Sequence, residues 1–269
     1  MNFKTLSMCA IAMMTVLAGC KGKNAGNTAC ESSCNENCEK NCGECCEDAD
    51  VFTATDNTTI KMFCIKHGSI RMQIGDKWLY VDPVTTGAMP ETDYSQFPKA
   101  DFILVTHNHY DHLDTLAISQ LSKEGTQVIA DKTSCESLGF GTAMANGDTI
   151  TIGDSWSLEA VPAYNYSEEK LAFHPQGRDN GYILTVGGTR IYIAGDTEDI
   201  PEMENIKNID VAFMPCNLPF TMTPEQLAKA AGTVQPKVLF PYHYGDTDMQ
   251  RVDSLLQNSG IDVRIRQYQ

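Results

Sequence analysis

The chain has 269 residues, of which 42% are hydrophobic and 20% are charged, an ordinary composition for a soluble globular protein. This length allows one large domain or two small ones. The formal net charge of −15 argues against a nucleic-acid partner, because phosphate binding needs a surface rich in lysine and arginine. Eleven cysteines are unusual for this length, and most of them lie near the N-terminus.

The first residues are typical of an exported protein. Lys4 precedes the apolar run LSMCAIAMMTVLAGC, which is too short to span a bilayer and has the length of a secretory signal. Its ending, Leu17 to Cys20, resembles the processing box of bacterial lipoproteins. The resemblance implies removal of residues 1–19, a lipid on the Cys20 thiol, and a membrane-anchored protein on the periplasmic or extracellular face of the bacterial cell envelope. An ordinary signal peptide with a coincidental cysteine is the alternative.

Residues 20–50 form a polar, acidic and cysteine-rich segment that lacks the aliphatic side chains needed for a core, so we expect a tether. Its cysteines recur every four residues and then occur as a pair, at positions Cys30, Cys34, Cys38, Cys42, Cys45 and Cys46. Disulfides or crosslinks, a soft-metal thiolate site, and no role at all remain open for them.

Residues 51–269 carry the pattern of one domain in which helices cover β-sheet, an α+β fold. Gly75–Asp76 and Gly187–Gly188 are hairpin signals. Thr223, Pro224 and Gln226 have the spacing of a capped helix start, and Gly232 is a stop signal. We expect helices at 112–125, 223–232 and 247–260, and strands at 59–65, 69–74, 77–83, 101–107, 126–130, 148–154, 156–164, 181–188, 189–196, 209–215, 237–244 and 261–267.

The stretch VTHNHYDHLD contains three of the six histidines in the chain, directly after a run that reads as a buried strand. In a loop of this spacing, His107 and His109 can turn toward one divalent ion while Asp111 and His112 turn toward a neighbouring one. Imidazole and carboxylate are ligands that zinc and related metals accept. The sequence therefore predicts a site for one or two divalent metal ions, with zinc the first choice and manganese or iron as alternatives.

This motif resembles that of the metallo-β-lactamase superfamily of metal-dependent hydrolases, whose four-layer αββα sandwich carries a one- or two-metal site. IYIAGDTE places Asp196 like the carboxylate that bridges the two metals, and LFPYHYGDT places His243 like the last histidine of the second metal. The opening strands resemble those of a branch that includes ascorbate-phosphate lactonase-like enzymes. The resemblance covers residues 51–269. It implies a metal-activated water that attacks a small ester, lactone or phosphodiester, with Asp111 as a catalytic residue that holds the water and carries a proton.

Asn165 departs from the superfamily pattern, which usually has a third histidine for the first metal at this point. The nearest substitute in the sequence is His174, which we interpret as a ligand or substrate contact, with a surface-loop histidine as the alternative. Further candidates for a ligand or a substrate contact lie at the ends of the motifs: Asn165, Arg178, Tyr164, Tyr242 and His67. The alternative for the tyrosines is packing in the core or behind the ligands, and the alternative for Arg178 is a solvated loop position.

Two other functions stay open. The protein could be an envelope lipoprotein that binds metal or buffers redox chemistry through its tether thiols, without use of the hydrolase fold. It could also be a binding module that has lost catalysis, an idea motivated by Asn165. The sequence leaves the substrate and the oligomeric state undetermined.

Overall fold

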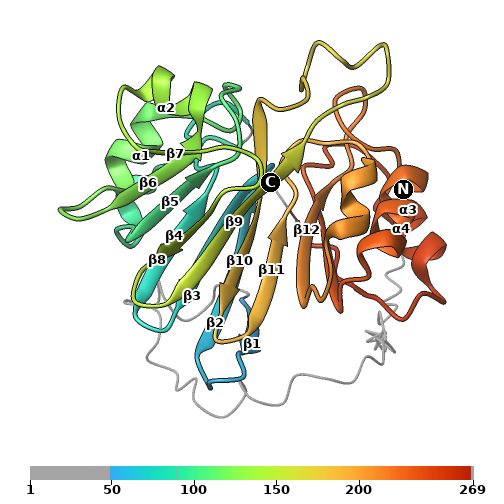
Figure 1. Cartoon of the computed structure of the whole chain (residues 1–269), viewed down its shortest axis with the longest axis horizontal. Coiled ribbons are helices and arrows are strands. Elements are labelled where there is room, and N and C mark those ends of the chain that lie inside the picture. Colours follow the sequence, from blue (N-terminus) through green and yellow to red (C-terminus); the bar gives the residue numbers. More distant parts are fainter. Residues whose placement is uncertain (1–48, 89, 268–269) are drawn as a thin grey trace, which may run out of the picture. The chain divides into compact units, whose positions relative to one another are not determined.

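The computed structural model describes residues 49–88 and 90–267, and the proposed signal peptide, Cys20 and the cysteine-rich segment before Ala49 lie outside the described residues. The part from Asp48 onward forms one compact unit. Two seven-stranded sheets face each other, and the helices cover their outer sides (Figure 1). This is the four-layer αββα arrangement expected from the sequence.

The first sheet has the strand order β1-β2-β3-β4-β5-β6-β7, so neighbours in sequence are neighbours in space. β1 to β4 pair antiparallel, and β4 to β7 pair parallel. Its helices are α1 (Thr115–Leu121), α2 (Lys132–Leu138) and the 3₁₀ turn η2 (Tyr94–Gln96). The strands are β1 (Asp50–Thr53), β2 (Thr59–Lys66), β3 (Ser69–Ile74), β4 (Lys77–Val81), β5 (Phe102–Val105), β6 (Gln127–Asp131) and β7 (Thr142–Met144).

The second sheet has the order β14-β13-β12-β11-β10-β9-β8, with antiparallel pairing from β8 to β11 and parallel pairing from β11 to β14. Its helices are α3 (Pro224–Val234), α4 (Met249–Leu256) and the 3₁₀ turn η3 (Pro201–Asn205). The strands are β8 (Thr149–Ile152), β9 (Trp156–Ala163), β10 (Asp179–Val186), β11 (Thr189–Ile193), β12 (Val211–Pro215), β13 (Val238–Tyr242) and β14 (Asp262–Val263).

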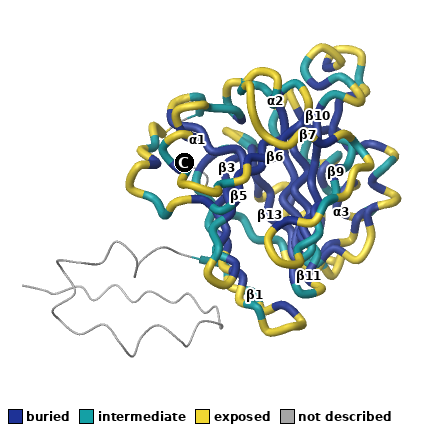
Figure 2. Tube along the Cα trace, turned by 60° about the vertical axis from the view of Figure 1, so that its left-hand side comes forward, coloured by how far each residue is buried: buried dark blue, intermediate teal, exposed yellow. Residues whose placement is uncertain are grey.

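Three apolar clusters hold the four layers together. One lies between the sheets and includes Phe213 and Phe240, whose rings stack with centroids 4.9 Å apart. A second lies between the second sheet and α3, α4 and η3, and a third between the first sheet and α1, α2 and η2. The buried segments run through the middle of the unit while loops and helix surfaces are exposed (Figure 2). Within the described part of the chain, no helix has the length and apolarity needed to cross a membrane.

Most expected elements are present, but several differ. The strands β1 and β7 were not expected, and the last strand is only Asp262–Val263 where residues 261–267 were expected. The helix expected from residue 112 begins only at Thr115, where the Asp114 side chain accepts hydrogen bonds from the backbone of Leu116 and Ala117. The capping box of α3 is present as expected, but the helix continues past Gly232 to Val234 and ends with Gln235 in the left-handed region. The short helix α2, capped by Asp131, was not expected from the sequence.

Candidate metal centre

All six histidines of the chain meet at one end of the two sheets, together with Asp111 and Asp196. Among the described residues, three overlapping groups have donor atoms within 4.8 Å of one another. The first position is the group His107, His109 and His174. The second position is the group His67, Asp111, His112 and His243. The third group, His107, His112 and Asp196, shares a residue with each position.

The donors come from both sheets. In the first sheet, the loop after β5 carries the HNHYDH motif, and the turn between β2 and β3 carries His67. In the second sheet, His174 lies between β9 and β10, Asp196 follows β11, and His243 follows β13. The site is therefore formed only when the two sheets pack against each other.

Asp82, at the end of β4, holds two of the histidines in place. Its Oδ2 lies 2.8 Å from Nδ1 of His112 and accepts a 2.7 Å hydrogen bond from the Thr106 hydroxyl. That hydroxyl lies 3.0 Å from Nδ1 of His107. Because the Thr106 proton goes to Asp82, the oxygen is left to accept from His107. Both imidazoles then present Nε2 to the site, as in the carboxylate–histidine pairs that orient metal ligands.

Asn165 orients the imidazole of His174, and it is His174 that lies beside His107 and His109 as the third donor of the first position. Its Oδ1 lies 2.6 Å from Nδ1 of His174, and its Nδ2 donates a 3.0 Å hydrogen bond to the carbonyl of Phe220. The amide is thereby fixed with its oxygen toward the ring, so Nδ1 of His174 carries the proton and Nε2 is free to bind. His174 is 1% exposed, which removes the alternative of a surface-loop histidine.

Asp196 lies between the two positions. Its Oδ2 is 3.4 Å from Nε2 of His174 and 3.2 Å from Nε2 of His243, while Oδ1 is 3.5 Å from Nε2 of His112. These three Nε2 atoms and Asp196 Oδ1 are buried polar atoms without a hydrogen-bond partner. Buried polar groups are normally satisfied, so several unsatisfied donors and acceptors aimed at one point fit a site built for cations.

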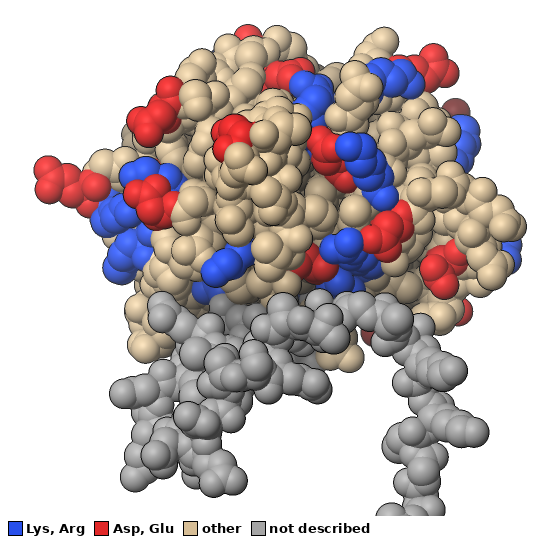
Figure 3. All heavy atoms as spheres, turned by 90° about the horizontal axis from the view of Figure 1, so that it is seen from below, with Lys and Arg blue, Asp and Glu red and all other residues tan. Residues whose placement is uncertain are grey.

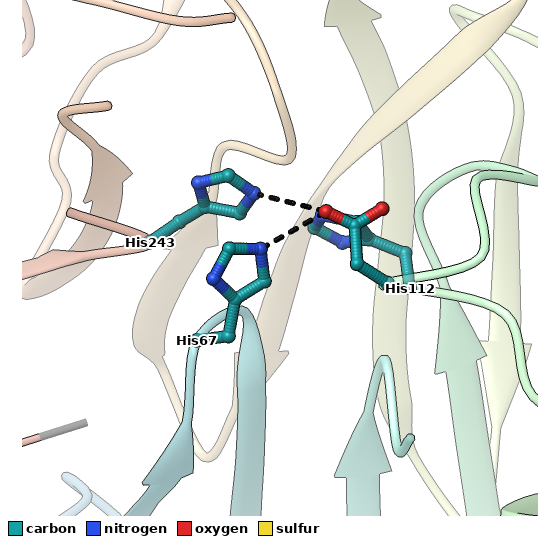
Figure 4. A group of neighbouring side chains, drawn as sticks. His67, His112 and His243 are labelled. Carbon is teal, nitrogen blue, oxygen red and sulfur yellow. Dashed lines mark hydrogen bonds and ion pairs between the residues drawn. The ribbon is translucent and has the colours of Figure 1, made fainter. Parts of the chain in front are cut away.

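The second position contains a close cluster of three imidazoles around one carboxylate (Figure 4). His67 Nε2 lies 3.0 Å and His243 Nε2 lies 3.8 Å from Oδ2 of Asp111. The ring centroids of His67 and His243 are 3.6 Å apart, and the rings are tilted by 42°. His112 points into the same space from the loop after β5 (Figure 4).

The electrostatics favour neutral imidazoles at the first position and ionised carboxylates beside them. Burial, with His174 and Arg178 nearby, lowers the pKa of His109 to about 4. Burial also lowers the pKa of His107 well below its usual value. Burial alone would raise the pKa of Asp196, but His243 and His112 hold it well below the usual range. A neutral imidazole and an ionised carboxylate are the protonation states that a metal ion needs.

At the second position, neighbouring side chains shift the pKa values of His112 and Asp111. Although burial opposes the charged form of His112, Asp196 and Asp82 raise its pKa well above the ordinary value. Burial would likewise raise the pKa of Asp111, yet His243 and His67 bring it far below the usual range. A protonated His112 beside ionised carboxylates is the arrangement expected where bound cations would otherwise supply the positive charge.

The other predicted contact residues lie around or behind this centre. Arg178 Nη2 is 3.4 Å from Nε2 of His109, but the guanidinium is also paired with both carboxylate oxygens of Asp179. Tyr164 donates its hydroxyl hydrogen to Glu202, 2.8 Å away, and packs in the cluster below α3. Tyr242 is fully buried in the cluster between the sheets. The two tyrosines therefore have the core role that was their alternative, and we expect no substrate contact from them.

Two functional residues were missed in the sequence. Asp82 follows the apolar strand β4 and has a φ of 44°, in the left-handed region that non-glycine residues rarely adopt. Gly68 lies against His112: a Cβ there would be 2.8 Å from its Cε1. In the sequence, Asp82 is marked only by its place at the end of a buried strand, and Gly68 only by its place after a histidine. Both patterns are common in sequences, so neither indicates a functional residue by itself.

Comparison with known proteins identifies the class. The family model described as the beta-lactamase superfamily domain matches residues 77–244. A UPF0173 metal-dependent hydrolase of Lysinibacillus sphaericus is 30% identical over 213 residues, which are 73% of this chain and 92% of that protein. One from Anaeromyxobacter dehalogenans is 32% identical over 189 residues, covering 64% of this chain and 69% of that protein.

Solved structures agree. A metal-dependent hydrolase from Parabacteroides distasonis superposes with a TM-score of 0.80 at 49% identity, covering 82% of this chain and 99% of that one. A metallo hydrolase from Ignicoccus hospitalis has the same fold at 23% identity, with a TM-score of 0.67 over 78% of this chain and 95% of its own. The chain belongs to the metallo-β-lactamase superfamily. Within it, the chain is a member of the UPF0173 family of metal-dependent hydrolases.

Proposed function

We propose that the protein hydrolyses a small ester, lactone or phosphodiester at a centre of one or two divalent ions. The observation that carries this proposal is the convergence of every histidine of the chain, with unsatisfied Nε2 atoms around Asp196. The fold alone does not choose a substrate, since solved structures with this fold include an isothiocyanate hydrolase and a diiron β-hydroxylase.

The proposed ligands divide between two ions. The first ion would be held by three imidazoles and the second by imidazoles and a carboxylate, with Asp196 between them. Nitrogen and carboxylate donors in this ratio favour zinc, and manganese and iron accept the same set. The first set is His107, His109 and His174; the second includes Asp111, His112 and His243.

Asp111 is the proposed catalytic residue. Ions bound at the two positions would lower the pKa of a coordinated water and polarise the oxygen of a scissile carbonyl or phosphoryl group. The Asp111 side chain is 21% exposed, whereas those of His112 and His243 are 0% and 1% exposed. Asp111 is thus the carboxylate that reaches the solvent side, where it can hold the attacking water by a hydrogen bond and pass its proton to the leaving group.

An assay of the purified protein with zinc, manganese or iron tests this function. 4-Nitrophenyl acetate, γ-butyrolactone and bis(4-nitrophenyl) phosphate represent the three substrate classes. Asp111→Asn keeps the size of the side chain but removes the proton acceptor, so we expect kcat to fall by about 10²-fold or more while the protein stays folded. Turnover at the wild-type rate in this variant would refute the catalytic role of Asp111.

Asp196→Ala should lose metal as well as activity, because two cations cannot lie close together without a carboxylate between them. Elemental mass spectrometry on the dialysed protein measures this directly. Full metal content in Asp196→Ala would mean that Asp196 does not join the two positions.

We further propose that the mature chain starts at a lipidated Cys20 and is anchored to the cell envelope, with a small molecule as its substrate partner. The support is the sequence of the first residues. Metabolic labelling with a fatty acid should mark the wild-type protein and leave Cys20→Ser unlabelled. Deletion of residues 30–46 separates this view from a function carried by the tether thiols, which predicts that metal content and activity depend on that segment.

A further inference from the structure

From the sequence, His67 is expected as a ligand or a substrate contact, and it lies outside the HNHYDH, Asp196 and His243 motifs. It occupies the turn between β2 and β3, 40 residues before His107. Its Nε2 points at Asp111, 3.0 Å away, and not toward bulk solvent, although the side chain is 18% exposed. A histidine that served only to contact water would turn its ring nitrogens to the solvent.

The backbone around His67 is held in an uncommon conformation. Its φ is 48°, and His243 has the same φ of 48°. The backbone N–H of His243 donates a 3.0 Å hydrogen bond to the carbonyl of His67, so the two turns fix each other. The next residue is Gly68, which allows the turn to lie against His112. Left-handed non-glycine residues cost free energy and persist where the surroundings require a particular geometry.

The ring of His67 is fixed as firmly as its backbone. Its centroid lies 3.6 Å from that of the His243 ring, in a tilted contact, and 5.8 Å from that of the His112 ring (Figure 4). Its donor atom lies within 4.8 Å of those of the other three members of the second position. The side chain is therefore pre-positioned against the same point as the proposed ligands, which is what a binding role needs.

We propose that His67 is an additional ligand of the second metal position, an inference that rests on the proposed function. The two positions are then unequal. The first has three imidazoles, and the second has three imidazoles and the carboxylate of Asp111, with Asp196 between them. With His67 as a ligand, an ion at the second position would connect the β2–β3 turn to the loop after β5 and to His243 after β13.

Zinc titration of the full-length protein, monitored by calorimetry, tests the inference. His67→Asn is the variant of choice, because asparagine tolerates the left-handed backbone and removes the imidazole. His243→Asn is its matched positive control, since it makes the same change at the same φ. His174→Ala removes a ligand of the first position, and Tyr110→Ala changes an exposed side chain of the motif loop. His67→Gln is a second variant that keeps a hydrogen-bonding amide near Asp111.

The expected result is that His67→Asn and His67→Gln lower the affinity for one of the zinc ions by about tenfold or more. A loss of this size is typical when a ligand, or a residue that orients a ligand, is removed. The His174→Ala variant should bind one zinc ion. Adding His67→Asn to this variant should lower its affinity for that remaining ion, as adding His243→Asn should. In the cobalt-substituted protein, both His67 and His243 variants should change the visible absorption bands of that ion, because the bands depend on the donor set. Tyr110→Ala should leave affinity and spectrum unchanged.

Two other outcomes are decisive in different ways. If the His67 variants bind both ions with wild-type affinity and spectrum while His243→Asn does not, His67 only hydrogen-bonds Asp111 and the inference is overturned, with the proposed function intact. If the wild type binds no zinc, or if His243→Asn and His174→Ala bind it unchanged, the proposed metal centre itself is wrong.

Discussion

Asn165 stands behind His174, and its side chain has both of its polar ends engaged, one by the imidazole and one by the carbonyl of Phe220. The imidazole is therefore locked in one tautomer and one orientation. At the scale of single residues, the centre depends on such partners as much as on the ligands, because a loosely held imidazole binds metal more weakly.

Asn165→Ala should lower the zinc affinity of the first position by about 10- to 100-fold and leave the second position unchanged. Asn165→Asp should lose less affinity than Asn165→Ala, because a carboxylate still accepts the hydrogen bond from Nδ1 of His174 but donates none to the carbonyl of Phe220. Competition with a chelator of known affinity measures both. An equal loss at both positions, or no loss in the alanine variant, would contradict the orienting role.

The residue scale also shows how far the sequence predicts this site. The HNHYDH motif, Asp196 and His243 were identified from spacing and from resemblance to a family, and all of them meet in the structure. Asp82 was missed, because its partners Thr106 and His112 lie 24 and 30 residues away in the chain. A hydrogen bond between distant segments has no signature in either segment alone.

At the scale of elements, a polar network joins the loop after β9 to the start of α3. Glu198 is fully buried and accepts hydrogen bonds from Lys170 Nζ at 2.8 Å and from the hydroxyl of Ser167 at 2.7 Å. Gln226, the third residue of α3, reaches the same carboxylate at 3.2 Å. This loop continues to His174, so the network fixes the segment that carries a proposed ligand.

Glu198→Gln should destabilise the protein at neutral pH by about 2 kcal/mol, because Lys170 then lacks its charged partner in a buried place. Burial by itself would raise the pKa of Glu198, but the bonds from Lys170 and Ser167 lower it to about 2. A folded pKa below the unfolded value stabilises the fold above about pH 4.5. That contribution is lost as the pH falls from about 4.5 to 2.

Urea unfolding at a series of pH values measures the effect. The difference in the free energy of unfolding between wild type and Glu198→Gln should be largest near pH 7 and shrink toward pH 3. Glu225→Gln is the matched control, since Glu225 lies next to Gln226 on α3 and both side chains of its ion pair with Arg251 are exposed. A Glu198 effect as small as that of Glu225, or one that does not change with pH, would refute the structural role of the network.

Elements with strong local signals were predicted well. The start of α3 was predicted because Thr223, Pro224 and Gln226 act within one turn, and the capping box forms as expected. Its end was misplaced because Gly232 lies in open space and has no need of a left-handed backbone, which Gln235 adopts instead. The seven residues of α2 are too few to show a helical period, so only its caps, Asp131 and the left-handed Gly139, mark it.

At the scale of the whole unit, the candidate centre closes the sandwich at one end. The apolar cluster between the sheets holds them along their length, whereas at the site the contacts between sheets are imidazoles and carboxylates. On the visible face of Figure 3, basic and acidic side chains lie beside one another. Exposed pairs of this kind contribute little to stability, so the layers are held by their cores and, where ions bind, by the site.

Bound metal should therefore stabilise the unit as a crosslink between the sheets. Ligands that bind only the folded state add RT ln(1 + [L]/Kd), which is about 2.7 kcal/mol at a hundredfold excess over Kd. For a unit of this size we expect EDTA to lower the Tm by roughly 5–10 °C per ion, and zinc to restore it. The shift should be absent in Asp196→Ala, which lacks the carboxylate between the positions.

Hydrogen exchange locates the effect. On chelation, the backbone N–H of His243, which bonds the carbonyl of His67 across the two sheets, should exchange faster, together with the N–H of Asn180, which bonds the carbonyl of Thr106. The N–H of Leu227, in the first turn of α3, bonds the carbonyl of Thr223 within one layer and should be unaffected. Faster exchange throughout α3, or an EDTA shift of equal size in Asp196→Ala, would show that the ions do not join the two sheets at this site.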